Sequence, residues 1–388
     1  MFIWSPVELG FAVVGNRVTA TERIKELAED FDVEAYFISG SKRLDEQSRL
    51  ISFWFEGGKI GDIHLLPNLT QTYGLKLASG FFLSIVVCFE IIAARSRRKL
   101  PLVITREPVS SVLVLLACKI LRIRSLYDAD PPFPYKVADT IGGVAFQNPI
   151  TRTLMQMVDY ACLALANAVA IPDRQAEKEL RAETHFVHPK RIVRLPFPIP
   201  ASFFDTKLNA PEDRISLKFL GFLYDLYDFQ PLIEAVGELG ESGLKIELIV
   251  IGSGEQKETL LEFVRAKGFQ NVHISEGAIP RSQIPSELAD ATGVVIPLRK
   301  AISGVPLKSV EAMAIGVPVL ISNPRDSTIF SDGNTCICLE ENSRGQWKSA
   351  IFRLRDRATR ERVVLGAKVI AEQYRPGKNK AAIRALIE

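Results

Sequence analysis

Short apolar, β-branched runs alternate with longer amphipathic segments along this chain of 388 residues. The alternation predicts an α/β fold, with parallel sheets built from right-handed βαβ units. The expected strands are Met1–Trp4, Val33–Ile38, Leu102–Thr105, Ser125–Asp128, Val169–Ile171, Ser216–Phe222, Lys245–Ile251, Val272–Ser275, Val294–Pro297 and Val317–Ser322. The expected helices are Thr21–Asp30, Gly74–Arg98, Val109–Leu121, Phe229–Leu239, Glu255–Lys267 and Leu307–Ala314.

The segment LPFPIPASFFD, Leu195–Asp205, divides this alternation into two halves. Its three prolines within five residues can continue neither a helix nor a central strand, so we expect a linker there. The prediction is two Rossmann-like domains, residues 1–200 and 201–370, that face each other across a cleft. We expect a C-terminal helix in residues 371–388 to pack back on the first domain. Ligands of such sheets bind beyond the carboxyl ends of the strands.

The composition excludes several classes of protein. Lys and Arg number 48 against 45 Asp and Glu, so nucleic-acid binding driven by net charge is not expected. A hydrophobic fraction of 47% excludes extended disorder. The first residues lack the basic and apolar regions of a secretory signal, and the five scattered cysteines are typical of reduced thiols. We therefore expect a cytoplasmic protein.

One stretch, Leu75–Leu126, departs from the even balance of charge. It carries nine basic residues against two acidic ones. Within it, the thirteen residues Leu77–Phe89 carry no charge, which is fewer than the roughly twenty residues that a membrane span needs. Three alternatives stay open. Leu77–Arg98 is a buried core helix, a helix on the inner face of a membrane with the basic RSRRK beside anionic head groups, or, against its short apolar run, a membrane span.

The most informative motif is SGVPLKSVEAMAIGVPVL, Ser303–Leu320. Pro306 stands where the first residue of a helix tolerates proline, and Gly316 stands where a helix ends in left-handed geometry. The loop SGV at residues 303–305 would run into the free N–H groups of a helix N-terminus. Such a terminus favours an anion, and a diphosphate would suit it.

One turn into this helix, Lys308 and Glu311 are spaced i, i+3 on the same face. Glu311 can accept hydrogen bonds from sugar or ribose hydroxyls, and Lys308 can neutralise phosphate. The alternative is an ion pair between the two on a solvated face, which is worth about a few tenths of a kcal/mol.

This motif resembles the donor-site helix and the following strand of family 4 glycosyltransferases, which have the GT-B fold. The resemblance runs in order from Leu217 to Tyr374. It rests on LGFLYDLYDFQPLIEAVGELG, ELIVIGSGEQKETL, SEGAIPRSQIPSELADATGVVIPL and SDGNTCICLEENS. In the first domain the resemblance is looser and rests on NRVTATERIKELAEDFDV and ALANAVAIPDRQAEKEL.

The resemblance implies retaining transfer of a sugar, without a metal or other cofactor. The donor would be a UDP- or GDP-sugar on the second domain, and the acceptor a lipid-linked or polysaccharide-precursor molecule on the first. Glu311 resembles the family's ribose-holding glutamate, and Asp130 lies where the family often has an active-site histidine. We take these two as the candidate catalytic residues. The predicted donor contacts are Gly252, Gly254, Ile279, Ser303, Gly304, Val305, Pro306, Leu307, Lys308 and Glu311.

Three departures from the family pattern stand out. Ser303 replaces the first glutamate of the motif, and Phe222 and Tyr227 replace the basic pair of the second domain. The glycine pair of the first domain becomes GFAVVG, Gly10–Gly15. Diphosphate charge would then rest on the helix N-terminus, on Lys308, and on Arg299 or the adjacent lysine. A second hypothesis follows from these losses, namely a catalytically degenerate partner subunit of GT-B type.

Residues in the first domain leave further alternatives open. Asp128 and Asp130 form a D-x-D, which could bind a divalent cation with the donor phosphates and make the enzyme metal-dependent. Asp130 could equally cap a helix or turn. Arg106 follows an expected strand and could contact an acceptor phosphate, or it could pair with Glu107 or lie at the surface.

Overall fold

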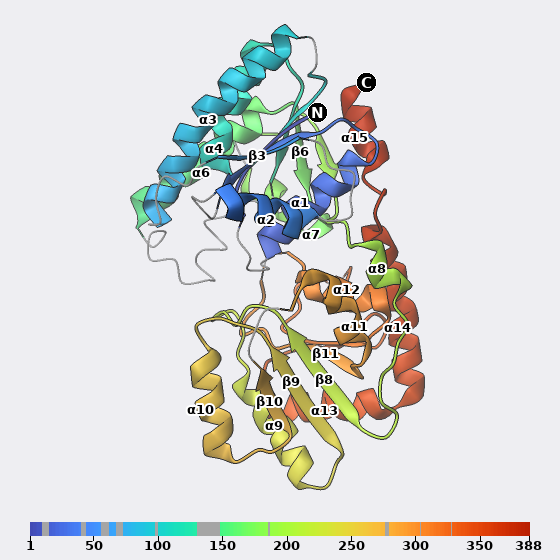
Figure 1. Cartoon of the computed structure of the whole chain (residues 1–388). Coiled ribbons are helices and arrows are strands. Elements are labelled where there is room, and N and C mark those ends of the chain that lie inside the picture. Colours follow the sequence, from blue (N-terminus) through green and yellow to red (C-terminus); the bar gives the residue numbers. More distant parts are fainter. Residues whose placement is uncertain are drawn as a thin grey trace. The chain divides into compact units, whose positions relative to one another are not determined.

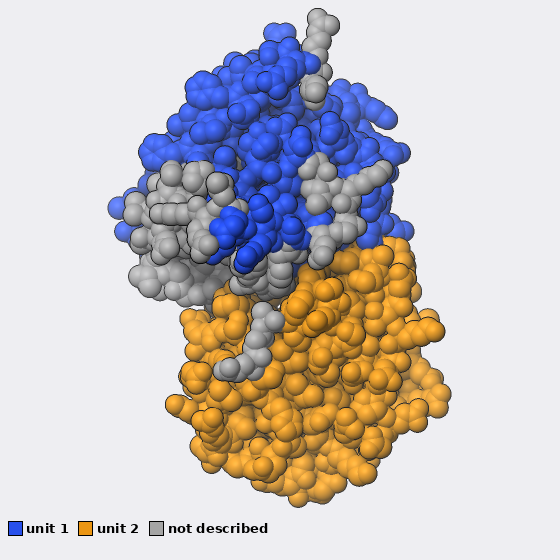
Figure 2. Space-filling model, in the orientation of Figure 1, with its two compact units in different colours: residues 1–198, 376–388 blue, residues 199–375 orange. Residues whose placement is uncertain are grey.

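The computed structural model describes residues 1–9, 15–39, 44–55, 62–66, 73–97, 100–129, 148–184, 187–275, 279–302, 304–326 and 328–388. The chain forms two compact units (Figure 2). Unit 1 comprises residues 1–198 together with residues 376–388, and unit 2 comprises residues 199–375. In the described residues, no helix has the length and hydropathy that crossing a membrane would require.

In the described part of unit 1, seven parallel strands form a sheet of order β3-β2-β1-β4-β5-β6-β7. The strands are β1 (Phe2–Leu9), β2 (Glu34–Ser39), β3 (Asp62–Leu66), β4 (Val103–Arg106), β5 (Ser125–Asp128), β6 (Ala168–Ile171) and β7 (Ile192–Arg194). The helices are α1 (Gly15–Ala28), α2 (Leu44–Phe55), α3 (Tyr73–Ser96), α4 (Pro108–Ile120), α6 (Pro149–Leu165), α7 (Arg174–Glu183) and α15 (Lys380–Ile387).

The helices of unit 1 cover both faces of its sheet. The crossovers through α3, α4 and α6 all run in the same direction along the sheet, so right-handed connections place these three helices on one face. They lie side by side there (Figure 1). Leu83, Val87 and Ile91 of α3 are buried in a core cluster with residues of α4, β1, β2 and β4. The crossovers through α1 and α2 run the opposite way and place those helices on the other face.

In the described part of unit 2, six parallel strands form a sheet of order β10-β9-β8-β11-β12-β13. The strands are β8 (Ile215–Leu220), β9 (Ile246–Ile251), β10 (Val272–Ser275), β11 (Gly293–Ile296), β12 (Val319–Ser322) and β13 (Ile337–Leu339). The helices are α8 (Ala201–Asp205), α9 (Gln230–Glu241), α10 (Lys257–Lys267), the 3-10 turn η2 (Arg281–Gln283), α11 (Ile284–Ala289), α12 (Leu307–Ile315), α13 (Arg344–Arg355), α14 (Arg357–Ala371) and η3 (Glu372–Tyr374).

The chain returns to unit 1 after η3. Glu26 of α1 is 2% exposed, and its carboxylate accepts hydrogen bonds from the backbone N–H of Gly377 at 2.8 Å and from Asn379 Nδ2 at 2.7 Å. Arg384 of α15 forms an ion pair with Asp30 at 2.8 Å. Buried and exposed polar contacts therefore hold α15 against α1.

Candidate functional site

Helix α12 of unit 2 begins and ends where its proline and glycine indicate, to within one residue. Pro306 is the N-cap, and the helix starts at Leu307 rather than at the proline itself. Gly316 ends it with φ of 95°, in the left-handed region that favours glycine. All residues from Ser309 to Ile315 are buried, whereas Leu307 and Lys308 at the start of the helix are half-buried. Gly304 and Val305 in the preceding loop are half-buried, whereas Ser303 lies outside the described residues.

The ammonium group of Lys308 lies against aromatic rings. Its Nζ is 3.6 Å from the ring centroid of Phe219 and 4.4 Å from that of Tyr227. A Cβ atom added at Gly221 would come within 2.8 Å of the same Nζ, so a glycine at the end of β8 leaves room for the lysine. Burial lowers the pKa of Lys308 to about 7, against a smaller opposing effect of Glu311. In the described part of the chain, no carboxylate forms an ion pair with Lys308.

Glu311 pairs with an arginine that sequence reasoning missed. Arg281 Nη1 donates to Glu311 Oε1 at 2.5 Å, and the two side chains are 15% and 7% exposed. The guanidinium of Arg281 also lies 5.1 Å from the ring centroid of Phe203. The expected alternative, an ion pair of Glu311 with Lys308 on a solvated face, is therefore wrong. Arg281 lies in a segment that carries the family resemblance, but its partner is 30 residues away in sequence.

Aromatic side chains occupy the positions of the missing basic pair. Tyr227 is 6% exposed and stacks edge-on against Phe219, with ring centroids 5.0 Å apart. Phe222 packs on Tyr224 with ring centroids 4.3 Å apart. Lys308 Nζ lies over the rings of Phe219 and Tyr227, so this part of the described structure holds a lysine packed among aromatic side chains.

Two of the three predicted glycine contacts are positions of close backbone approach, whereas a Cβ atom at Gly304 would meet nothing within 4 Å. A Cβ atom at Gly252 would lie 2.0 Å from the carbonyl oxygen of Gly221, so the loops after β8 and β9 touch at this point. At Gly254, with φ of 147°, a Cβ atom would lie 2.7 Å from the carbonyl oxygen of Leu223. Ile279 is half-buried and packs on the core of unit 2. These residues shape the carboxyl edge of the sheet, where ligands of parallel sheets bind.

Arg299 is engaged at the surface. Its Nη2 lies 2.9 Å from Asp225 Oδ1, and both side chains are about half exposed or more. Its Nε donates to the carbonyl oxygen of Asp225 at 3.1 Å. A phosphate would have to compete with this carboxylate for Arg299.

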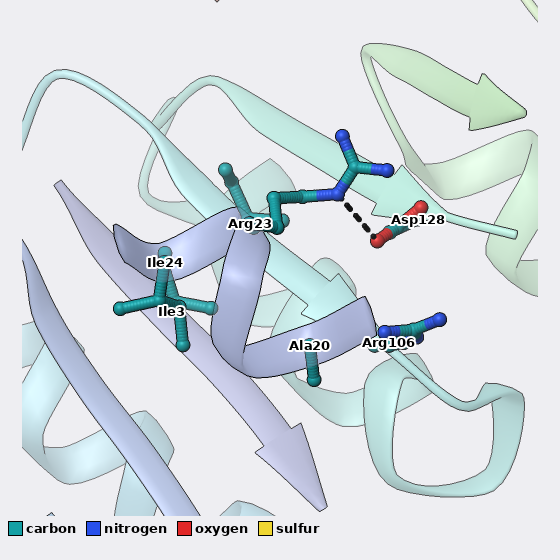
Figure 3. A pocket seen from close by; sticks show the side chains of 7 residues that line it. Ile3, Ala20, Arg23, Ile24, Arg106 and Asp128 are labelled. Carbon is teal, nitrogen blue, oxygen red and sulfur yellow. Dashed lines mark ion pairs between the residues drawn. The ribbon is translucent and has the colours of Figure 1, made fainter. Parts of the chain in front are cut away.

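In unit 1, two arginines and an aspartate converge at the carboxyl edge of the sheet (Figure 3). Arg106 and Asp128 are register partners on β4 and β5, and both are 4% exposed. Arg23 Nε of α1 lies 3.4 Å from Asp128 Oδ2. Arg106 is therefore not a surface residue, which was one of the expected alternatives. A small pocket here is lined by Ile3, Ala20, Arg23, Ile24, Ile104, Arg106 and Asp128.

The arginines of this pocket are held by oxygen atoms of unit 1. Arg23 Nη2 donates to the carbonyl oxygen of Leu195 at 2.7 Å, and Arg106 Nη2 donates to Thr19 Oγ1 at 3.0 Å. The two guanidinium groups and the carboxylate of Asp128 lie together among the residues that line this pocket. Arg23 Nη1 is buried and has no hydrogen-bond partner among the described residues. This unpaired donor suits an anionic group.

Glu107, directly after Arg106, has a strained backbone. Its φ of 70° lies in the left-handed region, which residues other than glycine rarely adopt. Burial raises the pKa of its carboxyl group, and Arg106 opposes that shift. Strain of this kind collects at functional sites. Asp130, the predicted catalytic residue in this part of the fold, lies outside the described residues.

A further buried carboxyl group lies beneath this edge. Asp159 of α6 is 3% exposed and accepts a hydrogen bond from Tyr127 Oη at 3.0 Å. Burial raises the pKa of Asp159 to about 7, while the bond from Tyr127 lowers it. In the described residues, no three His, Cys, Asp or Glu side chains come together as ligands of a metal ion would.

A family of known proteins matches most of unit 2. Residues 202–368 match the family model described as glycosyl transferases group 1. No curated protein matches the chain by sequence.

Solved structures match the whole chain at low identity. Anabaena HepE, crystallised with UDP and glucose, is 11% identical, with a TM-score of 0.70 over 99% of this chain and 98% of HepE. Sucrose-phosphate synthase from Thermosynechococcus elongatus is 17% identical, with a TM-score of 0.69 over 99% and 96%. WaaG, a glycosyltransferase of lipopolysaccharide biosynthesis, is 15% identical, with a TM-score of 0.64 over 98% of each chain. These matches confirm the predicted fold, two Rossmann-like units of GT-B type.

Proposed function

We propose that this chain, whose residues 202–368 match the group 1 glycosyltransferases, moves a hexose or related sugar from a UDP- or GDP-sugar to a lipid-linked or polysaccharide-precursor acceptor. The family match supports the predicted enzyme class. The observation that carries the proposal within the site is α12, whose first turn presents Lys308 and whose second turn presents Glu311 at the carboxyl edge of the sheet.

Donor binding is assigned to the first two turns of α12. Lys308 Nζ would contact the diphosphate, because a phosphate beside this half-buried lysine favours its charged form. Glu311 would accept from sugar or ribose hydroxyls while Arg281 holds its carboxylate in place. UDP is the first donor nucleotide to test, because the similar HepE structure contains UDP.

The acceptor is assigned to unit 1. Arg23 and Arg106 supply buried positive charge at the edge of the sheet, which suits a phosphate or carboxylate on the acceptor. We also propose transfer without a metal. The pairing of Asp128 with Arg23 supports this, because a carboxylate bound to a guanidinium is a poor cation ligand. We propose retention of the anomeric configuration on the resemblance to family 4. Comparing the anomeric configuration of the product with that of the donor sugar tests it.

The test is a calorimetric panel of UDP, GDP and their sugars on the full chain, with and without EDTA. A bound donor stabilises the folded state by about 2.7 kcal/mol at 100 times Kd. We expect one nucleotide to bind and EDTA to leave its affinity unchanged. Loss of binding in EDTA would favour the metal-dependent alternative through Asp128 and Asp130.

A specific observation favours the alternative function, a catalytically degenerate partner subunit of GT-B type. The aromatic residues Phe222 and Tyr227 stand where the family has cations, and Lys308 lies among them with a lowered pKa. Binding of no nucleotide or nucleotide sugar in the same panel would support that alternative and contradict the enzyme.

A further inference from the structure

The outer surfaces of α3, α4 and α6 are apolar where surface helices usually carry polar side chains. Among the side chains that the structure describes on these helices, the large exposed hydrophobic ones are Phe82, Ile85, Val86, Phe89 and Ile92 of α3, Leu116 and Ile120 of α4, and Ile150, Leu154 and Met157 of α6. We call this set the apolar face. Phe89, Ile120 and Ile150 are each about 70% exposed.

Helix α3 is apolar on both sides. Leu83, Val87 and Ile91 form the stripe that packs on the sheet, and all are at most 5% exposed. The residues from Phe82 to Ile92 in the apolar face follow the same helical spacing, offset to the opposite side of the helix. Burial in unit 1 therefore explains only half of this apolar helix. From the sequence, this segment could be a buried core helix or a helix on a membrane surface. The structure shows a buried apolar stripe and an exposed apolar stripe on the same helix, so it has the features of both.

The apolar face spans three neighbouring helices. Helix α4 lies between α3 and α6 and packs on both of them (Figure 1). Ten large exposed apolar residues gathered on adjoining helices point to an interaction site, whereas single exposed apolar residues need no explanation.

Basic residues border this surface at one end. Arg95 and Arg97 at the end of α3 and Lys119 and Arg122 at the end of α4 are exposed, and both helices end at the amino edge of the sheet. Among the described residues of the three helices, the acidic residues are Glu90, which is exposed, and Asp159, which is buried. Basic residues at helix ends also complement the helix dipole, but the dipole gives no reason for the apolar stripes.

We propose that the apolar face docks on an anionic lipid bilayer, with its helices lying in the plane of the interface. The charge decides between possible occupants, because four exposed cations beside an apolar surface complement anionic head groups above a hydrocarbon layer. This inference does not depend on the proposed transferase activity. It also enlarges the surface expected from sequence, which was confined to Leu77–Arg98, by adding α4 and α6.

The experiment measures co-sedimentation of the full chain with vesicles of phosphatidylcholine alone and of phosphatidylcholine with 30% phosphatidylglycerol. We expect binding to the anionic vesicles at low salt and a fall in binding as salt screens the charges. The double variant Phe89→Ser/Ile120→Ser should lower the partition coefficient about tenfold or more, because it removes apolar area from the interface. Both residues are exposed, so the fold should tolerate the change.

Two matched controls lie on unit 2. Leu365→Ser/Val369→Ser removes apolar residues of α14 that are 72% and 65% exposed, and it should leave the partition coefficient unchanged. Arg95→Gln/Arg97→Gln should weaken binding about fivefold per charge at low salt, whereas Arg344→Gln/Arg357→Gln on unit 2 should not.

Three outcomes would overturn the proposal. The first is equal binding to neutral and anionic vesicles, or binding to neither. The second is unchanged binding in Phe89→Ser/Ile120→Ser. The third is a dimer in sedimentation velocity that this same variant dissociates, because a second copy of the chain would then cover the apolar face.

Discussion

At the scale of single residues, Glu311 carries the assignment of the donor site. Glu311→Gln keeps the size of the side chain but removes the charge that faces Arg281 and, in the proposal, the donor hydroxyls. A charge-assisted hydrogen bond is worth about 1.5–3 kcal/mol, so we expect donor affinity or kcat/KM to fall about 10- to 100-fold. The change also leaves Arg281 beside a neutral group and should destabilise the free protein by about 1–3 kcal/mol.

The control for Glu311→Gln is Glu287→Gln, which weakens a different ion pair of unit 2, one that also contains a buried cation. Lys218, 5% exposed, lies 2.6 Å from Glu287. We expect both variants to lose stability in denaturant unfolding and only Glu311→Gln to lose donor affinity in calorimetry at a temperature where both are folded. Equal donor affinity in the two variants would refute the site.

Lys308 predicts a pH dependence of nucleotide binding. The pKa of Lys308 is about 7 in the free protein, and a diphosphate beside it favours the ammonium form, so binding should take up a proton. Above pH 7 the dissociation constant for UDP should therefore rise, by up to about tenfold per pH unit. Calorimetry in two buffers of different ionisation enthalpy measures the proton uptake directly.

Lys308→Met tests the origin of that dependence. This variant should bind UDP more weakly at pH 7, and its affinity should no longer change between pH 7 and 9. The pKa of Lys308 is about 7 in the folded chain and 10.5 in the reference state, so between these values the unfolded chain binds more protons than the folded chain. The unfolding free energy of the wild type should therefore also rise from pH 7 towards 10. A Met variant with the wild-type pH profiles would show that another group titrates.

Asp159 gives a prediction about stability alone. Its pKa is about 7 in the folded protein against 3.8 in the reference state, so the folded chain holds the extra proton between these values. The contribution of Asp159 to stability therefore falls as pH rises through this window. Asp159→Asn still accepts from Tyr127 and should stabilise the protein above pH 7 by about 2–4 kcal/mol, with no gain at pH 4. Urea unfolding at pH 4 and pH 8 measures both values, and a loss of stability at pH 8 would count against this account.

At the scale of elements, the proline and glycine around α12 predicted this helix, but the sequence did not predict which residues its side chains contact. Proline and glycine placed α12 to within one residue because their effects on the backbone depend on neighbouring residues only. The contact of Arg281 with Glu311, and that of Arg23 with Asp128, join residues far apart in the sequence. Such pairs depend on how strands are ordered in the sheet, which residue patterns alone do not specify.

Among the described residues, three strands were not predicted, and all three lie at the edges of the described sheets. β3 and β7 border the sheet of unit 1, and β13 borders that of unit 2. β7 and β13 have three residues each, and every side chain of β3 is exposed or half-buried. An edge strand lacks the buried apolar run of a central parallel strand, so its sequence resembles a loop.

At the scale of the whole molecule, the chain completes unit 1 only at its end. Residues 376–388 belong to unit 1, although unit 2 separates them from the rest of it in the sequence. The side chain of Glu26 is buried, and its oxygen atoms accept hydrogen bonds from donors in this segment, among them Asn379. Unit 1 should therefore lose stability when the contact is removed, while unit 2 should not.

The variant that tests this is Asn379→Ala, because Asn379 Nδ2 donates both to Glu26 Oε2 at 2.7 Å and to the carbonyl oxygen of Pro196 at 2.9 Å. A lost hydrogen bond to a buried carboxylate costs about 1.5–3 kcal/mol, so the thermal transition of unit 1 should move down by several degrees. Arg384→Gln is the matched control on α15, since its pair with Asp30 is exposed and worth at most about 1 kcal/mol. UDP affinity, which we assign to unit 2, should stay within about twofold of wild type in both variants, because a twofold change is less than 0.5 kcal/mol. If Asn379→Ala instead weakened UDP binding and left the thermal transition in place, the C-terminal segment would belong to the donor site rather than to the stability of unit 1.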